Sequence, residues 1–281
     1  MKKALAILLA ATMLMATTAC GSNAEETKAE TTAEAEEIEV VVFAAASMTE
    51  TLTQIAELYK EVAPNVTLVF NFDSSGTLKT QIEEGAVCDL FISAGQKQMN
   101  QIDINADAEI NTDGLDFVEE GTRINLLENK VTLVVSDDNA KNIQSFDDMV
   151  AGLNDGSILL AMGNEDVPVG QYTQKILAYF ELDEATLANA GSITYGSNVK
   201  EVTTQVKEGT VDCGVIYCTD AFSAELTVVD NATAEMCGQV IYPAAVMNTS
   251  AHKAEAQAFL DYLTADEAMA GFETVGFAPV E

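Results

Sequence analysis

Four turns in this sequence place a small or polar residue where a strand-like run gives way to a helix-like pattern. They are centred on Ser47, Ser74–Ser75, Val169–Gly170 and Asn198–Val199. In open α/β sheets, ligands bind beyond the carboxyl ends of the strands, where helix N-termini offer unpaired N–H groups and a positive dipole end. Four such termini around one cleft would form a cage for an anion. Helix capping is the alternative interpretation of the serines, since serine is a common N-cap.

The elements that must position these turns alternate along the chain. Residues 38–46 form a continuous apolar run with β-branched side chains, as in a strand covered on both faces, and residues 48–62 repeat apolar side chains at helical spacing. Ser47 and Glu50 have the spacing of a capping box. Further strands are expected at 66–72, 87–92, 130–136, 158–162, 193–195, 211–218 and 240–247, with helices between most of them and a closing helix around 258–263. This alternation predicts an α/β fold with mostly parallel sheets, in two sets that suggest two lobes.

The N-terminus has the pattern of an export signal. Lys2 and Lys3 precede an apolar run, residues 4–16, that is too short to span a bilayer. Small residues then lead to Cys20, in the context at which a bacterial lipoprotein is cut and acylated, although Thr17 stands where that pattern prefers leucine. We therefore expect a signal peptide at 1–19 and, at 20–39, the lipid-anchor site followed by a disordered Ala/Glu/Thr-rich tether. The body would be held at the outer face of the cytoplasmic membrane, or be periplasmic if it is not anchored.

The composition limits the kinds of partner. The formal net charge is −32, which argues against nucleic acid and anionic membrane surfaces, because both need basic patches. It would also repel an anionic ligand at long range. An anion must therefore be held by short, oriented hydrogen bonds inside a cleft.

Residue types also argue against an enzyme and a metal site. His252 is the only histidine and lies among polar residues, so a Ser-His or Cys-His pair lacks its base. The nucleotide-binding glycine motifs do not occur at strand-to-helix turns. Four cysteines remain beside Cys20, and their mostly apolar contexts favour buried free thiols over disulfides or zinc ligation: Cys88, Cys213, Cys218 and Cys237. We expect no catalytic residue, no bound metal ion and no cofactor.

Several strings, in their order and spacing from about residue 39 to the C-terminus, resemble the molybdate-binding proteins of ABC transporters. They are VFAAAS at 42–47, FDSSGTL at 72–78, DLFISA at 89–94, VPVGQY at 167–172, GVIY at 214–217, VIYP at 240–243 and GF at 276–277. The resemblance implies a type II periplasmic-binding-protein fold, two α/β lobes around a ligand cleft that close on a tetrahedral dianion. Lobe 1 would comprise 40–122 plus 243–281, and lobe 2 would comprise 123–242.

The resemblance also implies the ligand contacts. Hydroxyl groups would come from Ser47, Ser75 and Tyr217, and backbone N–H donors from Ser47, Ser75, Val169 and Val199. The sequence departs from the family pattern at Asp73 and Gly76, which flank the second serine, and at Cys218, where glycine is common. A carboxylate at residue 73 would disfavour an anion unless it points away.

Neutral donors on a rigid frame would select an oxyanion without protons. The O–H group of a protonated phosphate would face a protein hydrogen-bond donor and leave that donor unpaired. Sulfate would be rejected by size, whereas molybdate and tungstate are nearly equal in size. The resemblance thus predicts a monomeric binding protein for molybdate or tungstate, with the membrane permease of an ABC importer as its partner. The alternatives are a binding protein for sulfate or phosphate and an exported serine hydrolase using Ser47 or Ser75.

Overall fold

The computed structural model describes residues 36–280 of the chain. The predicted signal peptide, Cys20 and most of the predicted tether lie outside the described residues. In the described part, no helix combines the length and the apolar character needed to cross a membrane.

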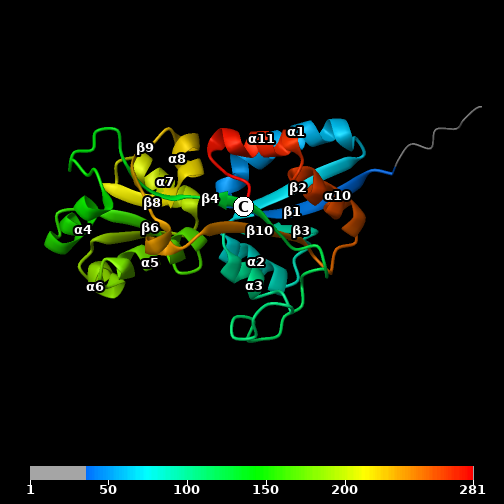
Figure 1. The fold of residues 1–281 in the computed structure, drawn as a ribbon, viewed down its shortest axis with the longest axis horizontal. Helices are drawn as coiled ribbons and strands as arrows, with labels where there is room; N and C mark the ends of the chain where they lie inside the picture. Colours follow the sequence, from blue (N-terminus) through cyan, green and yellow to red (C-terminus); the bar gives the residue numbers. More distant parts are fainter. Residues whose placement is uncertain (1–35, 281) are drawn as a thin grey trace, which may run out of the picture. The chain divides into compact units, whose positions relative to one another are not determined.

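Two five-stranded sheets organise the body (Figure 1). The first has the order β2-β1-β3-β10-β4, and the second has the order β7-β6-β8-β5-β9. The strands of the first are β1 (Ile38–Ala45), β2 (Val66–Asp73), β3 (Leu90–Ile92), β4 (Ile124–Asn129) and β10 (Val240–Val246). Those of the second are β5 (Val131–Val135), β6 (Leu160–Gly163), β7 (Ile193–Gly196), β8 (Cys213–Tyr217) and β9 (Thr227–Asn231). Each sheet with its helices forms one lobe of the expected α/β fold.

Both sheets are mixed rather than mostly parallel. Strand β1 pairs in parallel with β2 and β3, and β6 pairs in parallel with β7 and β8. Strand β10 is antiparallel to β3 and β4, and β5 is antiparallel to β8 and β9. The antiparallel strands β4, β5, β9 and β10 are the ones that flank the two passages between the sheets.

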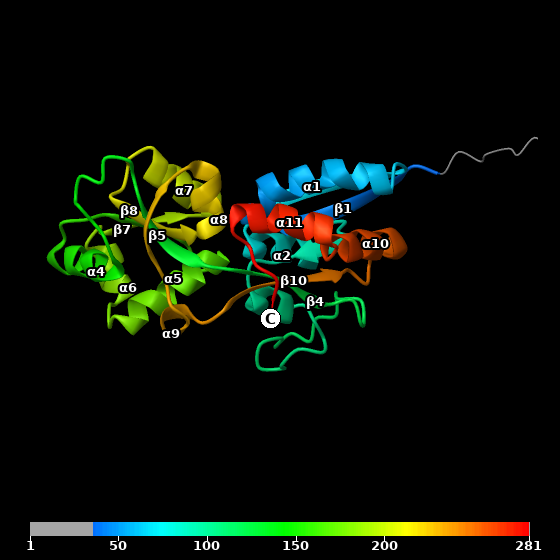
Figure 2. The ribbon, with the colours of Figure 1, turned by 45° about the horizontal axis from the view of Figure 1, so that its top comes forward.

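Helices surround each sheet (Figure 1). The first lobe carries η1 (Ala46–Met48), α1 (Thr49–Val62), α2 (Ser75–Glu83), α3 (Gln96–Asn100), α10 (Lys253–Leu263) and α11 (Asp266–Val275). The second carries α4 (Phe146–Asp155), α5 (Pro168–Tyr179), α6 (Glu184–Asn189), α7 (Val199–Lys207), α8 (Cys218–Ala224) and α9 (Ala234–Cys237). Helix α8 packs against α11 (Figure 2). Helix α7 packs against η1. The two lobes are therefore in contact through their helices.

The chain changes sheet at other points than the expected lobe boundaries. Strand β4 lies in the first sheet, so the first passage falls between Asn129 and Val131 rather than at residue 123. The return falls between Asn231 and Val240, before the expected residue 243. The difference arises because β10 supplies β4 with its partner from far along the chain, which no local pattern indicates.

The four cysteines of the described part are free thiols, as predicted, but the predicted burial is wrong for Cys218. Cys88, Cys213 and Cys237 are buried, whereas Cys218 is only half-buried. The Cys218 thiol donates to Asn129 Oδ1 at 3.2 Å.

Candidate functional site

One small cavity between the two lobes brings together all five residues that the resemblance singled out. Its volume is about 10 Å³, close to the ~10–15 Å³ that a single buried water molecule needs. The lining is Ala45, Ala46, Ser47, Asp73, Ser74, Ser75, Ala94, Val167, Pro168, Val169, Val199 and Tyr217. It combines the ends of β1, β2 and β8 with the starts of η1, α2, α5 and α7. The space is thus about the size of one water molecule.

Neither predicted serine acts as a helix cap. Ser47 lies in η1, and α1 begins at Thr49 without a side-chain cap, so the predicted capping box is wrong. The N-cap of α2 is Ser74, whose side chain accepts from the Thr77 N–H at 3.1 Å. Ser75 is the first residue of α2, and its Oγ accepts from the Ala94 N–H at 2.9 Å. Because a hydroxyl carries one proton, Ser75 keeps that proton free for another acceptor.

Four backbone N–H groups at the cavity lack an acceptor. In residues 36–280, no hydrogen bond joins the N–H of Ser47, Ser75, Val169 or Val199 to a protein acceptor. These residues are at most 4% exposed. They stand in the first turn of a helix, where the ladder of intrahelical bonds has not begun. Burying an N–H without a hydrogen-bond partner costs free energy, so a ligand that accepts from these four donors would be bound favourably.

Tyr217 adds a hydroxyl group from the second lobe. The ring is buried and packs edge-on against Tyr172 and Tyr242, with ring centroids 6.4 and 5.7 Å apart. The hydroxyl donates to the Ala94 carbonyl at 3.4 Å, longer than a usual O–H···O bond. Burial raises the pKa of Tyr217 well above its ordinary value. The phenol thus stays protonated and can donate to a better acceptor.

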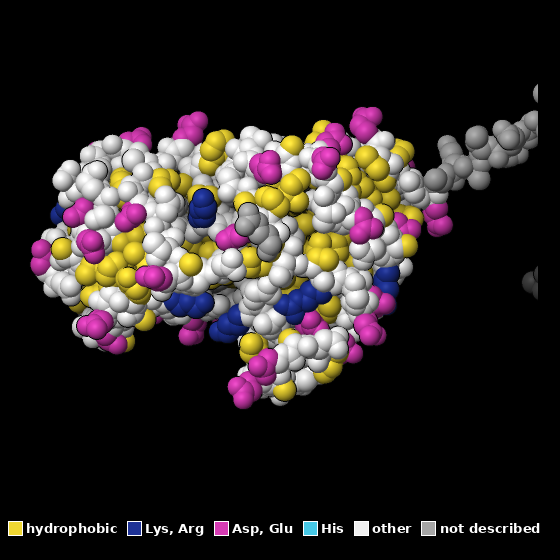
Figure 3. All heavy atoms as spheres, viewed as in Figure 1, with side chains coloured by type: hydrophobic (Ala, Val, Ile, Leu, Met, Phe, Trp, Pro, Cys, Tyr) yellow, Lys and Arg dark blue, Asp and Glu magenta, His cyan; other side chains and the backbone are white. Residues whose placement is uncertain are grey.

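No cation lines the cavity in the described part of the chain, and one carboxylate does. Asp73 Oδ1 accepts from the Ser74 N–H at 2.7 Å and from Asn198 Nδ2, which crosses from the second lobe, at 3.4 Å. These two N–H donors stabilise the carboxylate, but Asp73 still lines the cavity, so the unfavourable contact with an anion noted from the sequence remains. Figure 3 shows acidic side chains scattered over the visible face of the molecule. Attraction of an anion must therefore come from the local N–H and O–H donors.

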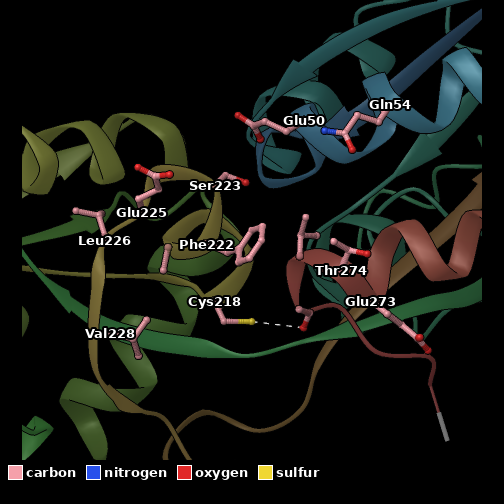
Figure 4. Close-up of a pocket in the computed structure, with 13 residues that line it drawn as sticks. Glu50, Gln54, Cys218, Phe222, Ser223, Glu225, Leu226, Val228, Glu273 and Thr274 are labelled. Atoms are coloured by element: carbon pink, nitrogen blue, oxygen red, sulfur yellow. Dashed lines mark hydrogen bonds between the residues drawn. The ribbon is translucent and has the colours of Figure 1, made fainter.

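A larger cavity of about 970 Å³ is a weaker candidate for an anion. It lies where α1 and α11 face α8, and Figure 4 shows Phe222 projecting into it beside Cys218 and Thr274. Glu50, Glu225 and Glu273 also line it (Figure 4). Three carboxylates would repel an anion.

Comparison with known proteins agrees with this architecture. Residues 40–278 match the family described as bacterial extracellular solute-binding protein. The chain belongs to this family.

Two curated relatives of this solute-binding protein align with nearly their whole length. One, from Bacillus subtilis, is 31% identical over 98% of each chain, and its name assigns it provisionally as an ABC transporter substrate-binding lipoprotein, YvgL. The other is the molybdate-binding protein ModA of Mycobacterium tuberculosis, 31% identical over 96% of each chain.

Solved structures show the same fold. A substrate-binding domain assigned to a molybdenum ABC transporter of Clostridium difficile is 30% identical, with a TM-score of 0.61, covering 87% of this chain and all of that one. The periplasmic molybdate-binding protein of Azotobacter vinelandii has a TM-score of 0.71 at 20% identity, covering 86% of this chain and all of that one. The latter likeness supports the fold alone.

The structure adds contacts between the lobes that the sequence analysis missed. A Cβ placed on Gly76 would lie 2.2 Å from the Asp166 carbonyl oxygen of the second lobe. Lys200 of α7 pairs with Glu50 of α1 at 2.7 Å and with Asp220 of α8 at 3.2 Å. These partners lie between 20 and 150 residues apart, so no spacing in the sequence could have indicated them.

Asp220 is fully buried, and neither of its oxygens has a well-formed hydrogen bond within the described part. Burial raises the pKa of its carboxyl to about 6, against the opposing effect of Lys200. Because this value lies above the ordinary 3.8, the folded protein binds more protons than the unfolded chain between these pH values, and stability falls as pH rises through them.

Asp220→Asn is therefore expected to raise the free energy of unfolding at pH 7.5 by about 1–3 kcal/mol. The gain should shrink as pH falls from about 6 to about 4, because the folded wild type then binds a proton at Asp220 and no longer buries a charge. Urea unfolding at pH 7.5 and pH 4.5 measures both values. A variant less stable than wild type at pH 7.5 would mean that the attraction to Lys200 outweighs the cost of burial.

Proposed function

We propose that this solute-binding protein captures a fully deprotonated tetrahedral oxyanion, molybdate or tungstate, in the cavity between its lobes and delivers it to an ABC importer. The observation that carries the proposal is the convergence of four buried N–H groups without protein acceptors. The N–H groups of Ser47, Ser75, Val169 and Val199 would bind the oxygens of the anion, together with the hydroxyls of Ser47, Ser75 and Tyr217. The names of the M. tuberculosis and C. difficile relatives agree with this ligand class.

Selection would follow from the kind of donor. All the proposed contacts are N–H or O–H groups, so each needs a lone pair from the ligand. A tetrahedral dianion without protons can satisfy every one of them, whereas a protonated phosphate brings an O–H group against a donor and leaves it unpaired. Sulfate carries no proton either, and its smaller size would leave some donors out of reach.

Outside the cytoplasm, the protein would act as a monomer tethered through Cys20. The export signal and the tether-like segment behind it support this arrangement, as does the lipoprotein name of the B. subtilis relative. The lipid anchor would keep the body near the membrane permease of the importer. Binding would involve no catalytic step and no cofactor.

A thermal-shift panel with molybdate, tungstate, sulfate and phosphate tests the ligand class. Molybdate and tungstate at 100 times their dissociation constants should each stabilise the protein by ~2.7 kcal/mol, whereas sulfate and phosphate at equal concentrations should shift the unfolding midpoint much less. A larger shift with sulfate or phosphate would assign the protein to that anion instead. Hydrolysis of generic esters, lost in Ser47→Ala or Ser75→Ala, would support the hydrolase alternative.

A further inference from the structure

A buried chain of hydrogen bonds links the passages between the lobes to the cavity. Asn129 is the last residue of β4, where the chain leaves the first sheet, and Tyr242 lies in β10, where it has returned. Asn129 Nδ2 lies 3.1 Å from the Tyr242 hydroxyl oxygen, which lies 2.9 Å from Ser47 Oγ. The three residues are at most 4% exposed. Water therefore does not compete for these groups.

Which group donates in each of these hydrogen bonds follows from the other hydrogen bonds of the same residues. The Lys130 N–H donates to Asn129 Oδ1 at 2.7 Å, which fixes the amide with its nitrogen toward Tyr242. The Tyr242 oxygen must then accept, because an amide nitrogen only donates. Its own proton is then available to Ser47 Oγ, which lies 2.9 Å away. Burial raises the pKa of Tyr242 well above its ordinary value, so the phenol keeps that proton.

Ser47 is thus an acceptor toward Tyr242, and its single proton is free to point into the cavity. Ser75 is arranged in the same way, since the Ala94 N–H donates to its oxygen at 2.9 Å. Each cavity serine therefore receives a hydrogen bond from outside the cavity and can donate one within it. A hydroxyl without such a partner could rotate and present a lone pair instead.

We propose that Asn129 and Tyr242 are positioning residues that hold Ser47 as a hydrogen-bond donor toward the cavity and so favour oxyanions without protons. The proposal rests on the proposed function, since it concerns how that site distinguishes its ligands. A serine free to rotate could accept from a protonated phosphate. A serine that accepts from Tyr242 has one of its two lone pairs occupied, which favours donation over acceptance toward the ligand.

The variant Asn129→Asp reverses the direction of donation along these hydrogen bonds, with almost no change in the shape of the side chain. A carboxylate still accepts from the Lys130 N–H, but it cannot donate to Tyr242. The tyrosine then donates to the carboxylate and accepts from Ser47, whose lone pairs would face the ligand. Molybdate affinity, measured by calorimetry at pH 7.5, should fall by at least ~10-fold, the scale of one lost hydrogen bond to a charged group.

The new carboxylate would also repel the anion directly, so the same change is made in a Ser47→Ala background. Repulsion acts in both backgrounds, whereas proton reversal needs the serine. The proposal expects a loss at least ~3-fold smaller in the Ser47→Ala background, as a double-mutant cycle measures. Equal losses in the two backgrounds, or no loss in either, would overturn it.

Tyr242→Phe provides a second measurement without added charge, should Asn129→Asp fail to fold. Freeing Ser47 should reduce the ratio of molybdate affinity to phosphate affinity, whereas general damage to the site would weaken both anions alike and overturn the proposal. If wild type binds another ion of the panel instead of molybdate, the proposed ligand fails, and the cycle is run with the ion that binds. Failure of the positioning role is thus distinguished from failure of the ligand assignment.

Discussion

Replacing Gly76 by alanine is expected to weaken oxyanion binding by at least ~10-fold, while the protein without ligand becomes slightly more stable than wild type. Gly76 is the second residue of α2, directly after Ser75. An added Cβ would lie 2.2 Å from the Asp166 carbonyl oxygen and 3.0 Å from its carbonyl carbon. These are backbone atoms of the other lobe, so no side-chain rotation relieves the clash.

The lobes would have to separate by about 1 Å to restore an ordinary contact, which stretches hydrogen bonds to a ligand held from both sides beyond their useful range. The three atoms nearest to the added methyl group all belong to Asp166, so separating the lobes relieves this clash. Alanine favours a helix over glycine by up to ~1 kcal/mol, so α2 itself should gain stability. The expected loss of affinity and the expected effect on the unliganded protein therefore have different signs.

Calorimetry with molybdate and thermal unfolding without it measure the two effects. Gly271→Ala in α11 is the matched control, because its Cβ would meet only Ile55 carbons at 3.5 and 3.7 Å. It should leave the affinity unchanged. Wild-type affinity in Gly76→Ala would mean that the ligand binds with the lobes further apart than in this structure.

The positions of the candidate donors could be predicted because they depend on local rules. A helix always leaves its first N–H groups unpaired, and parallel strands end at one edge of their sheet. The turns at Ser75, Val169 and Val199 therefore had to present donors wherever the lobes placed them. That these turns converge on one cavity was an expectation from the family resemblance, and the structure has them lining the same space.

The hydrogen-bond partner of Ser47 could not be predicted from the local sequence. Its spacing to Glu50 predicted a capping box, yet its hydroxyl bonds to Tyr242, 195 residues along the chain. The serine's partner is determined by the pairing of β10 within the first sheet, which the local sequence does not encode. The same strand accounts for the displaced lobe boundaries, since β4 pairs with it.

Contacts between residues far apart in the sequence cannot be predicted from local patterns either. Gly76 was noted as a departure from the family pattern, but its meaning depends on Asp166 of the other lobe. Asp220 lies in an ordinary-looking segment, and only the fold shows that it is buried beside Lys200. The role of Gly76 can be recognised only once the two lobes are in contact, and that of Asp220 only once α7 and α8 pack together within the second lobe.

Val199→Pro is expected to reduce oxyanion affinity by ~10- to 150-fold through the loss of one N–H group. Val199 is the first residue of α7, a position that proline favours, and α5 already begins with Pro168. The preceding residue, Asn198, has φ −152° and ψ 172°, the extended conformation that a residue before proline adopts. The helix should thus form normally, because the deleted N–H takes no part in its hydrogen bonds.

Val199→Ala separates the donor from the side chain. Val199 is 4% exposed, so truncation should lower the unfolding midpoint while the N–H remains in place. Calorimetry should then find molybdate affinity within about threefold of wild type for alanine and at least tenfold weaker for proline. Proline also directs its ring toward the space that the N–H hydrogen occupied, which adds a steric loss to the lost bond. Equal affinities for the two variants would remove the residue 199 N–H from the ligand contacts, and the cage would then rest on α2, α5 and η1 alone.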